Sequence, residues 1–364
     1  MKIGLVRRGY SATGGAEAYL LRLAEALVPL GHVPVLITTS QWPADRWVSE
    51  EIIRLAGNSP DQFAAAFRAA STGCDLHLSL ERVPGCEVFR AGDGVHAAWL
   101  ERRKHCEPFW KRATRWMNPK HAQLMRLERA VFDPANTRAV IANSHLIRNE
   151  ILARFPFPAE RIHVVPNGLT PPSATADRLA ARLRYGVPDE AFCALFVGTG
   201  WDRKGLETAL RAVERSGRTT LLVAGRGPAK QFASPAAKFL GPVSDLSSLH
   251  AAADLFVLPT WYDPFSNACL EALAAGLPVL TTPANGFSEI IQPGIHGAIV
   301  QEGDIAGFAR EINVWRERSA AARPACMALA AEFSIERNTR ETLAVIAAVS
   351  GKLRKTATHT TASP

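Results

Sequence analysis

Several chemical signatures are absent from this chain of 364 residues. There is no Asp-x-Asp triplet, no HExxH motif and no Walker A loop, which are common ways of holding a catalytic metal ion or a metal–nucleotide complex. The GxGxxG fingerprint of dinucleotide binding is absent as well. We therefore expect an activity that needs neither a bound metal nor a dinucleotide cofactor.

Cysteine and long apolar runs are also scarce. The six cysteines are scattered and form no CxxC pair, which favours reduced, mostly buried thiols in a cytoplasmic protein. No apolar run approaches the roughly 18 residues of a membrane span. The N-terminus opens directly with a short strand-like segment and two arginines, which is not the pattern of a signal peptide. These features predict a cytoplasmic location without a membrane-spanning helix.

Size and charge narrow the class of protein. A chain of 364 residues with 47% hydrophobic residues exceeds one typical core and predicts about two domains. The formal net charge of +8 indicates an anionic partner. That partner can be a nucleotide, a phosphorylated substrate, an anionic membrane or a nucleic acid.

Short β-branched runs alternate with segments of helix length along most of the chain. Strands are predicted at 2–7, 33–38, 75–80, 87–91, 138–143 and 162–166, and again at 192–198, 219–225, 254–259 and 278–282. This alternation is typical of parallel sheets with crossover helices. The sequence therefore predicts an α/β fold made of two Rossmann-like domains.

A segment rich in Pro, Thr and Ser, residues 166–177, is the natural linker between the two halves. We place the N-terminal domain at 1–168 and the C-terminal domain at 169–334. The helical pattern resumes near Phe308 and continues, with breaks, to about residue 350. The polar tail 351–364 is expected to be disordered.

The stretch 254–282 reads as a strand, a polar turn over 263–267, a helix and a second strand. Backbone N–H groups at such a helix start attract phosphate, through their missing partners and the helix dipole. Glu271 lies inside the helix, where its carboxylate can accept hydrogen bonds from sugar hydroxyls. The spacing of Asp263 and Glu271 by itself is equally compatible with an ordinary strand–helix unit whose acids are solvated.

Two further turns carry chemistry at strand ends. Gly14 and Gly15 open a helix after the first strand, and such a pair lets the backbone approach a ligand closely. Arg203 and Lys204 follow the strand at 192–198, just before another helix. Arginine offers a planar fork to phosphate oxygens and lysine a point charge. The alternatives are a helix-packing turn for the glycines and a solvated surface pair for the cations.

The acidic-x7-acidic spacing of Asp263 and Glu271, followed by AxxAGLPVL, resembles the nucleotide-sugar site of retaining GT-B glycosyltransferases of family 4. In that family the first acid is usually Glu, whereas Asp263 is one methylene shorter. Weaker matches follow in the expected order at 142–151, 165–169, 223–228 and 285–291. The resemblance implies two Rossmann-like domains that face each other across a cleft. It also implies a C-terminal helix, here near 335–350, that packs back on the N-terminal domain.

The same resemblance implies roles for single residues. Glu271 binds the ribose of the nucleotide and Asp263 lies near the transferred sugar. Arg203 and Lys204 hold the diphosphate and stabilise it as it leaves. The other residues that it assigns to the nucleotide-sugar site or its rim are Gly14, Gly15, Gly198, Gly225, Gly227, Phe265, Ser266, Asn267, Ala268, Gly286 and Glu289.

The segment 82–104 resembles the lipopolysaccharide core glucosyltransferase I branch of that family. The resemblance implies that Asp93, in the turn Gly-Asp-Gly at a strand end, is the catalytic carboxylate. It places Glu17 and His96 on the acceptor side. The alternative for Asp93 is a turn or cap residue.

Residues 99–129 combine many Arg and Lys side chains with interleaved aromatic residues. This combination suits the interface of an anionic bilayer. The same features are compatible with nucleic-acid binding, although no RNA- or DNA-binding motif accompanies them. A solvated helix face is the third interpretation.

Taken together, these patterns predict a retaining, metal-independent glycosyltransferase with no cofactor. The expected donor is a UDP-hexose such as UDP-glucose, and the expected acceptor is a membrane-borne glycolipid such as the lipopolysaccharide core. The protein would then act peripherally at the inner face of the cytoplasmic membrane, with no nucleic-acid partner. Two alternatives remain: a non-hydrolysing UDP-sugar epimerase of the same architecture, and a non-catalytic protein that binds membrane or nucleic acid.

Overall fold

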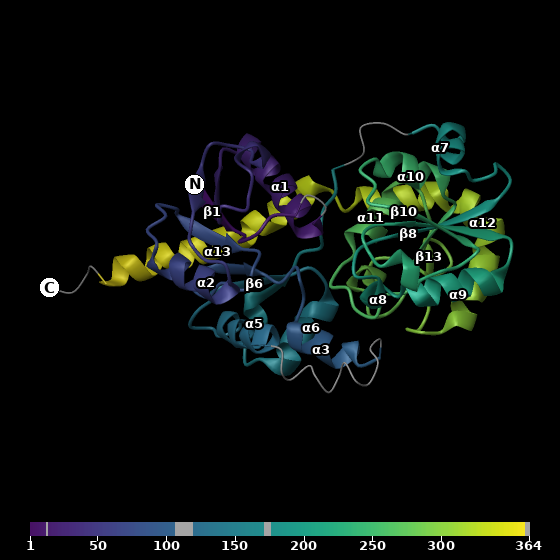
Figure 1. Ribbon diagram of the computed structural model, residues 1–364. Coiled ribbons are helices and arrows are strands. Elements are labelled where there is room, and N and C mark those ends of the chain that lie inside the picture. The colour runs from purple at the N-terminus through teal and green to yellow at the C-terminus, as the bar shows by residue number, and fades with distance from the viewer. Residues whose placement is uncertain (12–13, 106–118, 171–175, 361–364) are drawn as a thin grey trace. The chain divides into compact units, whose positions relative to one another are not determined.

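A computed structural model describes residues 1–11, 14–105, 119–170 and 176–360. The chain divides into two compact units, each with its own sheet (Figure 1). Unit 1 takes in 1–100, 109–168 and 335–364, and unit 2 takes in 101–108 and 169–334, so far as the structure describes them. The cysteine at 106 and the middle of the predicted basic segment, 106–118, lie outside the described residues.

Unit 1 contains a seven-stranded sheet in the order β3-β2-β1-β4-β5-β6-β7, with every neighbouring pair parallel. The strands are β1 (Lys2–Val6), β2 (Val33–Thr38), β3 (Ile52–Arg54), β4 (Leu76–Ser79), β5 (Val88–Arg90), β6 (Ala139–Ala142) and β7 (Ile162–Val164). The helices of this unit are α1 (Gly15–Leu27), α2 (Pro60–Ala69), α5 (Pro119–Val131), α6 (His145–Arg154) and α13 (Ile335–Thr360). Helix α3 (His96–Arg103) begins in unit 1, and its last three residues belong to unit 2.

Unit 2 contains a six-stranded parallel sheet in the order β10-β9-β8-β11-β12-β13. Its strands are β8 (Phe192–Val197), β9 (Thr219–Ala224), β10 (Ala237–Gly241), β11 (Leu255–Leu258), β12 (Val279–Thr281) and β13 (Gly297–Ile299). Its helices are α7 (Arg178–Tyr185), α8 (Trp201–Lys204), α9 (Leu206–Ser216), α10 (Leu246–Ala252), α11 (Asn267–Ala274) and α12 (Ile305–Ala331).

These sheets confirm the prediction of two parallel α/β domains. The strands that the sequence did not predict are β3, β10 and β13, and each of them lies at the edge of its sheet. Edge strands are covered less completely than central ones, and β3 and β10 are largely half-buried or exposed. They therefore lack the continuous apolar run by which a central parallel strand is recognised.

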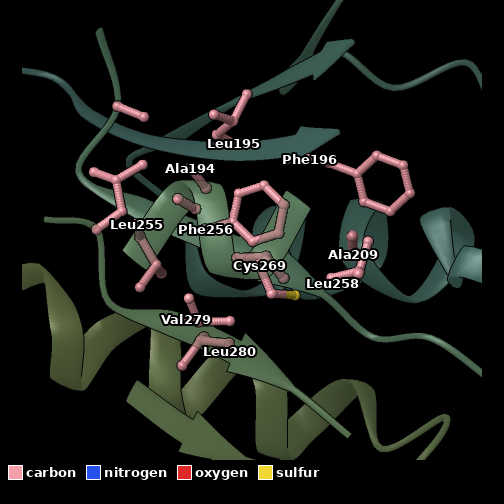
Figure 2. Close-up of a cluster of buried hydrophobic side chains, with 14 of the residues drawn as sticks. Ala194, Leu195, Phe196, Ala209, Leu255, Phe256, Leu258, Cys269, Val279 and Leu280 are labelled. Atoms are coloured by element: carbon pink, nitrogen blue, oxygen red, sulfur yellow. The ribbon is translucent and has the colours of Figure 1, made fainter. Parts of the chain in front are cut away.

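The core of unit 2 explains why the turn after β11 is held firmly. Figure 2 shows Phe196 of β8, Phe256 of β11 and Leu280 of β12 in one buried cluster with Cys269 of α11. Burying a large apolar side chain contributes about 1.5–3 kcal/mol. Because Cys269 points into this core, α11 is anchored through one face, and its first turn is fixed at the carboxyl end of β11.

The helix α13, yellow in Figure 1, belongs to unit 1 and packs against α1 and β6. Its side chains Val345, Ile346 and Val349 are buried in the core of that unit. Near its start, the amide oxygen of Asn338 accepts a hydrogen bond of 2.9 Å from the hydroxyl of Tyr19. The backbone is helical to Thr360, into the tail that the sequence predicted to be disordered. Among the described helices, none is long and apolar enough to span a membrane.

Each sheet has a point at which the strand order reverses, between β1 and β4 in unit 1 and between β8 and β11 in unit 2. In open α/β sheets ligands bind outside the carboxyl ends of the strands at such a point. The residues that follow β1, β4, β8 and β11 are therefore the first candidates for a functional site.

A buried carboxylate holds the turn that leads from β5 into α3. Glu128 of α5 is fully buried and accepts hydrogen bonds from the backbone N–H groups of His96 (2.6 Å) and Ala97 (3.0 Å). Its charge is compensated by the guanidinium of Arg82, whose Nε lies 3.1 Å from Oε1. The carboxylate satisfies helix-start donors that have no partner within the helix, and it also interacts favourably with the helix dipole.

Replacing Glu128 with Ala is therefore expected to destabilise unit 1. The change leaves the Arg82 charge and two backbone donors without their partner, and breaking a buried pair in this way costs about 3–5 kcal/mol. Urea unfolding followed by circular dichroism measures the loss. The matched control is Glu25→Ala, because Glu25 is exposed on α1 and its removal should change stability by less than about 0.5 kcal/mol. Equal stability of the two variants would show that the Glu128 contacts contribute nothing.

Candidate functional site

The turn after β11 is joined to the loop after β12 by backbone and side-chain hydrogen bonds. The N–H of Asp263 donates to the carbonyl of Ala284 (2.9 Å), and the carbonyl of Asp263 accepts from the N–H of Gly286 (2.9 Å). The side-chain oxygen of the fully buried Asn285 accepts from the N–H groups of Ser266 (3.3 Å) and Phe287 (3.1 Å). The turn is thus a rigid part of the sheet edge.

Helix α11 begins at this turn. The Ser266 hydroxyl accepts a hydrogen bond from the N–H of Cys269 (3.4 Å) and caps the helix. The sequence predicted that the backbone N–H groups of this turn attract phosphate. Three of them, those of Asp263, Ser266 and Cys269, already donate to acceptors within the protein. Glu271 lies one turn further along the helix and is half-buried.

Lys204 and Asp263 form an ion pair across the point where the strand order of unit 2 reverses. The Lys204 side chain is 12% exposed and that of Asp263 is 8% exposed. Next to this pair, a terminal guanidinium nitrogen of Arg203 donates to the carbonyl of Tyr262 at 2.7 Å. The sequence assigned Lys204 to the diphosphate and Asp263 to the sugar, and the structure joins them directly. An ammonium has three donors and a guanidinium five, so both cations have further hydrogens with which to bind an anion.

Several glycines around this pair are required by close backbone approach. A Cβ on Gly225, whose φ is +124°, would lie 1.9 Å from the carbonyl oxygen of Gly198. A Cβ on Gly205, at φ +76°, would lie 1.9 Å from the carbonyl oxygen of Pro259, and one on Gly227 would meet the Trp201 ring at 2.3 Å. These positions thus have a packing reason to be glycine that is independent of a ligand.

A second polar cluster lies after β1, β4 and β5 in unit 1, and its centre is Arg7. The Arg7 guanidinium contacts Oε1 of Glu17 through Nη2 (3.0 Å) and Nε (3.3 Å), and its Nη1 lies 3.3 Å from Oδ2 of Asp93. The same Nη1 donates to the carbonyl of Leu80 (3.3 Å). Burial by itself lowers the pKa of Arg7, but the carboxylates of Asp93, Glu17 and Glu81 outweigh burial and hold that pKa above its ordinary value.

The turn that carries Asp93 leaves the aspartate half exposed, with 49% of its side chain accessible. Asn143 supports the turn by donating to the carbonyl of Gly92 (3.3 Å). His96 begins α3, and its Nε2 lies 3.1 Å from Nδ1 of His121, with the two rings stacked. Asp93 and His96 therefore lie at the same end of unit 1.

The structure brings the predicted site residues together as two sets. In unit 2, the residues near the turns after β8, β9, β11 and β12 are Gly198, Arg203, Lys204, Gly225, Gly227, Asp263, Phe265, Ser266, Asn267, Ala268, Glu271, Gly286 and Glu289. In unit 1, the residues near the turns after β1 and β5 are Gly14, Gly15, Glu17, Asp93 and His96. The Phe265 ring is buried in the core, packed edge-to-face on Phe287. Only the backbone of Phe265, and not its ring, therefore faces the turn.

Sequence reasoning missed three residues that shape these sets. Arg7 and Asn285 each follow a buried strand, and their position at a strand end was the available signal. Glu128 had no such signal, because it lies near the end of a basic segment that was predicted to face an anionic membrane. Within the residues that the structure describes, no three side chains of His, Cys, Asp or Glu gather closely enough to hold a metal ion.

Comparison with known proteins identifies the family of the chain. Residues 191–316 match the family model described as "Glycosyl transferases group 1", and residues 92–172 match "Glycosyltransferase Family 4". The lipopolysaccharide glucosyltransferase WaaG of Escherichia coli K12 is 24% identical over 319 residues, which cover 80% of this chain and 83% of that protein.

Solved structures show the same fold. The crystal structure of WaaG, a glycosyltransferase involved in lipopolysaccharide biosynthesis, aligns with a TM-score of 0.71 at 21% identity, covering 96% of this chain and 98% of that one. Anabaena HepE in complex with UDP and glucose aligns with a TM-score of 0.73 at 19% identity, covering 94% and 99%. The resemblance read from the sequence is confirmed, and the chain is a GT-B glycosyltransferase with domains of family 4 and group 1.

Proposed function

We propose that the protein is a retaining glycosyltransferase that moves a hexose from a UDP-sugar, UDP-glucose first among the candidates, to a membrane-borne glycolipid such as the lipopolysaccharide core. The observation that carries this proposal is the Lys204–Asp263 ion pair beside Arg203, at the point where the sheet of unit 2 reverses its strand order. Two cations at that place suit a departing diphosphate.

The choice of donor rests on the unit 2 set. Glu271 lies one turn into α11, and we propose that its carboxylate accepts hydrogen bonds from the ribose hydroxyls. The HepE structures support uridine as the base of the donor, since that protein was solved with UDP and with UDP-glucose. The acceptor class is supported by the name of WaaG, which is a lipopolysaccharide glucosyltransferase.

The chemistry requires stabilisation of a sugar with oxocarbenium character and of the leaving diphosphate. Arg203, Lys204 and the first turn of α11 stabilise the diphosphate by charge and oriented dipoles, and no metal ion takes part. Asp263 holds the Lys204 ammonium in place, so the cation needs no reorganisation when the bond breaks. We assign retention to same-face attack, in which the leaving phosphate accepts the acceptor proton. Asp93 then orients or stabilises the sugar rather than attacking it.

Glu271→Ala is expected to weaken donor binding. Losing a charged hydrogen-bond partner costs about 1.5–3 kcal/mol, which corresponds to roughly 10- to 100-fold in affinity. Titration calorimetry with UDP measures this directly. Glu317→Ala is the control, because Glu317 is exposed on α12 of the same unit and should leave UDP affinity unchanged. A folded Glu271→Ala protein that binds UDP as tightly as the wild type would remove Glu271 from the site.

Turnover of a UDP-sugar should survive EDTA, whereas Arg203→Ala or Lys204→Ala should lower kcat by about 10²–10³-fold, the usual cost of removing one preorganised partner of the transition state. UDP release measures turnover, and a thermal melt checks that each variant is folded. Arg211→Ala is the control, since Arg211 is exposed on α9 and pairs only with Glu207 one turn away among the described contacts. Activity abolished by EDTA and restored by Mg²⁺ would contradict the metal-free mechanism.

Peripheral membrane binding is proposed through the basic segment 99–129. Of this segment the structure describes 99–105 and 119–129, where Lys120, Arg126 and Arg129 are exposed. Each cation contributes about 1 kcal/mol near an anionic surface, and salt screens exposed charges over about 10 Å at 0.1 M. The protein should therefore sediment with anionic vesicles at low salt and much less with neutral vesicles or at high salt.

The placement of this binding surface is tested by neutralising five of its cations. The positions are Arg102, Arg103, Lys111, Arg112 and Arg115, the last three of which lie outside the described residues. The matched control neutralises five exposed arginines of unit 2, namely Arg211, Arg215, Arg218, Arg310 and Arg318. We expect the first variant to lose vesicle binding and the control to keep it. Wild-type protein that ignores anionic vesicles would refute the membrane proposal, and equal binding by both variants would refute its placement.

A further inference from the structure

Arg7 connects two carboxylates that come from different elements of unit 1. Glu17 belongs to the first turn of α1, and Asp93 belongs to the turn between β5 and α3. One guanidinium reaches both, with Nη2 3.0 Å from Glu17 and Nη1 3.3 Å from Asp93. Arg7 itself comes directly after β1, which neighbours β4 in the sheet, and β4 neighbours β5. The three side chains therefore meet at the carboxyl edge of three consecutive strands.

The neighbouring arginine is committed to a different acid. Arg8 pairs with Glu81 through its guanidinium (3.3 Å), and its backbone N–H donates to the same carboxylate (2.7 Å). Arg7 and Arg8 are thus consecutive, partly buried arginines with separate carboxylate partners. Among the described ion pairs of these two arginines, Asp93 pairs with Arg7 and not with Arg8.

The contact between Glu17 and Arg7 lies at the start of α1 and is largely buried. Glu17 is 6% exposed, and a buried carboxylate without a cation is costly. A Cβ on Gly14 would lie 1.8 Å from Oε2 of Glu17, so a larger residue at this position would require the Glu17 carboxylate to move. Glu17 in turn holds the Arg7 guanidinium by two contacts, to Nη2 and Nε. The remaining nitrogen, Nη1, is thereby directed between the carbonyl of Leu80 and Asp93.

We infer that Arg7 is a positioning residue for glycosyl transfer, which acts by holding Asp93 in one orientation. The inference rests on the proposed function, because it assumes that Asp93 faces the transferred sugar. It adds a residue that neither the sequence patterns nor the comparisons single out. Glu17 acts through Arg7 as its anchor, and Arg7 acts through Asp93.

The physical reason is preorganisation. Asp93 is half exposed, and without a partner its carboxylate would rotate among several staggered conformers in water. With Oδ2 held on Arg7, the direction of the other oxygen is fixed before the reaction begins. A carboxylate that stabilises developing positive charge on a sugar is effective only when it does not have to reorient. A misplacement of about 1 Å can cost on the order of 100-fold in rate.

The test is a double-mutant cycle on turnover of UDP-glucose by the full-length protein, followed by UDP release. The variants are Arg7→Gln, Asp93→Asn and the double variant, with Arg8→Gln as the matched control. Arg8→Gln also removes a guanidinium from a partly buried carboxylate after β1, but it leaves Asp93 untouched. Titration calorimetry with UDP is run on every protein, since the proposed nucleotide-binding groups lie in unit 2.

We expect Arg7→Gln to lower kcat by about 10- to 100-fold with little change in UDP affinity or in KM for the donor. The double variant should be no slower than Asp93→Asn alone, because Arg7 has nothing to act on once the carboxylate is gone. Arg8→Gln should keep wild-type kcat. If Arg7→Gln does not fold, Arg7→Lys replaces it in the cycle. Lysine keeps the charge but lacks the fork that reaches both acids, so the same non-additivity is expected with a smaller loss.

Three results would overturn the inference. An active wild type with an equally active Arg7→Gln would remove Arg7 from catalysis. Losses in the single variants that multiply in the double variant would show that Arg7 does not act through Asp93. An equal loss of kcat in Arg8→Gln would reduce the effect to general damage at this edge of the sheet. A wild type that turns over no UDP-sugar is a different failure, because it overturns the proposed function and the inference with it.

Discussion

The burial of parallel strands on both faces is the constraint on which the rest of this structure depends. Central strands such as β8 and β11 are apolar throughout and are covered by helices, so they leave no room for polar chemistry along their length. Polar side chains can reach solvent only where a strand ends. The residues proposed to be functional are therefore concentrated at the carboxyl ends, and the strand order decides which of them meet.

Each unit has an ion pair at the carboxyl ends of its strands. In unit 2 the cation of Lys204, after β8, is held by the carboxylate of Asp263, after β11. In unit 1 the cation of Arg7, after β1, is held by Glu17 and contacts Asp93, after β5. In both cases a partly buried ion pair fixes a charged group that faces the edge of the sheet. Such pairs contribute little net stability, because desolvation offsets their attraction, but they hold charges in a defined geometry.

How far the sequence predicts this arrangement depends on the range of the interactions. Local patterns were sufficient for the central strands, for the turn at 263–267 and for the helix that carries Glu271, because each is encoded within a few residues. The edge strands β3 and β10 were missed because their residues are only partly buried. The pairs Lys204–Asp263 and Arg7–Asp93 join residues 59 and 86 positions apart, and no local pattern reports such a contact. The burial of Glu128 was also beyond reach, because its neighbours in the sequence are basic and its partners lie in other elements.

The measurement that tests the account most directly is a screen of nucleotide sugars with the purified protein, with and without EDTA, which records both binding and slow hydrolysis. The account predicts that UDP-hexoses bind, that one of them is slowly hydrolysed with release of UDP, and that EDTA changes neither result. Isomerisation of a UDP-sugar without release of UDP would identify an epimerase instead. Failure to bind any nucleotide sugar, by a folded protein, would contradict the proposed donor site in unit 2.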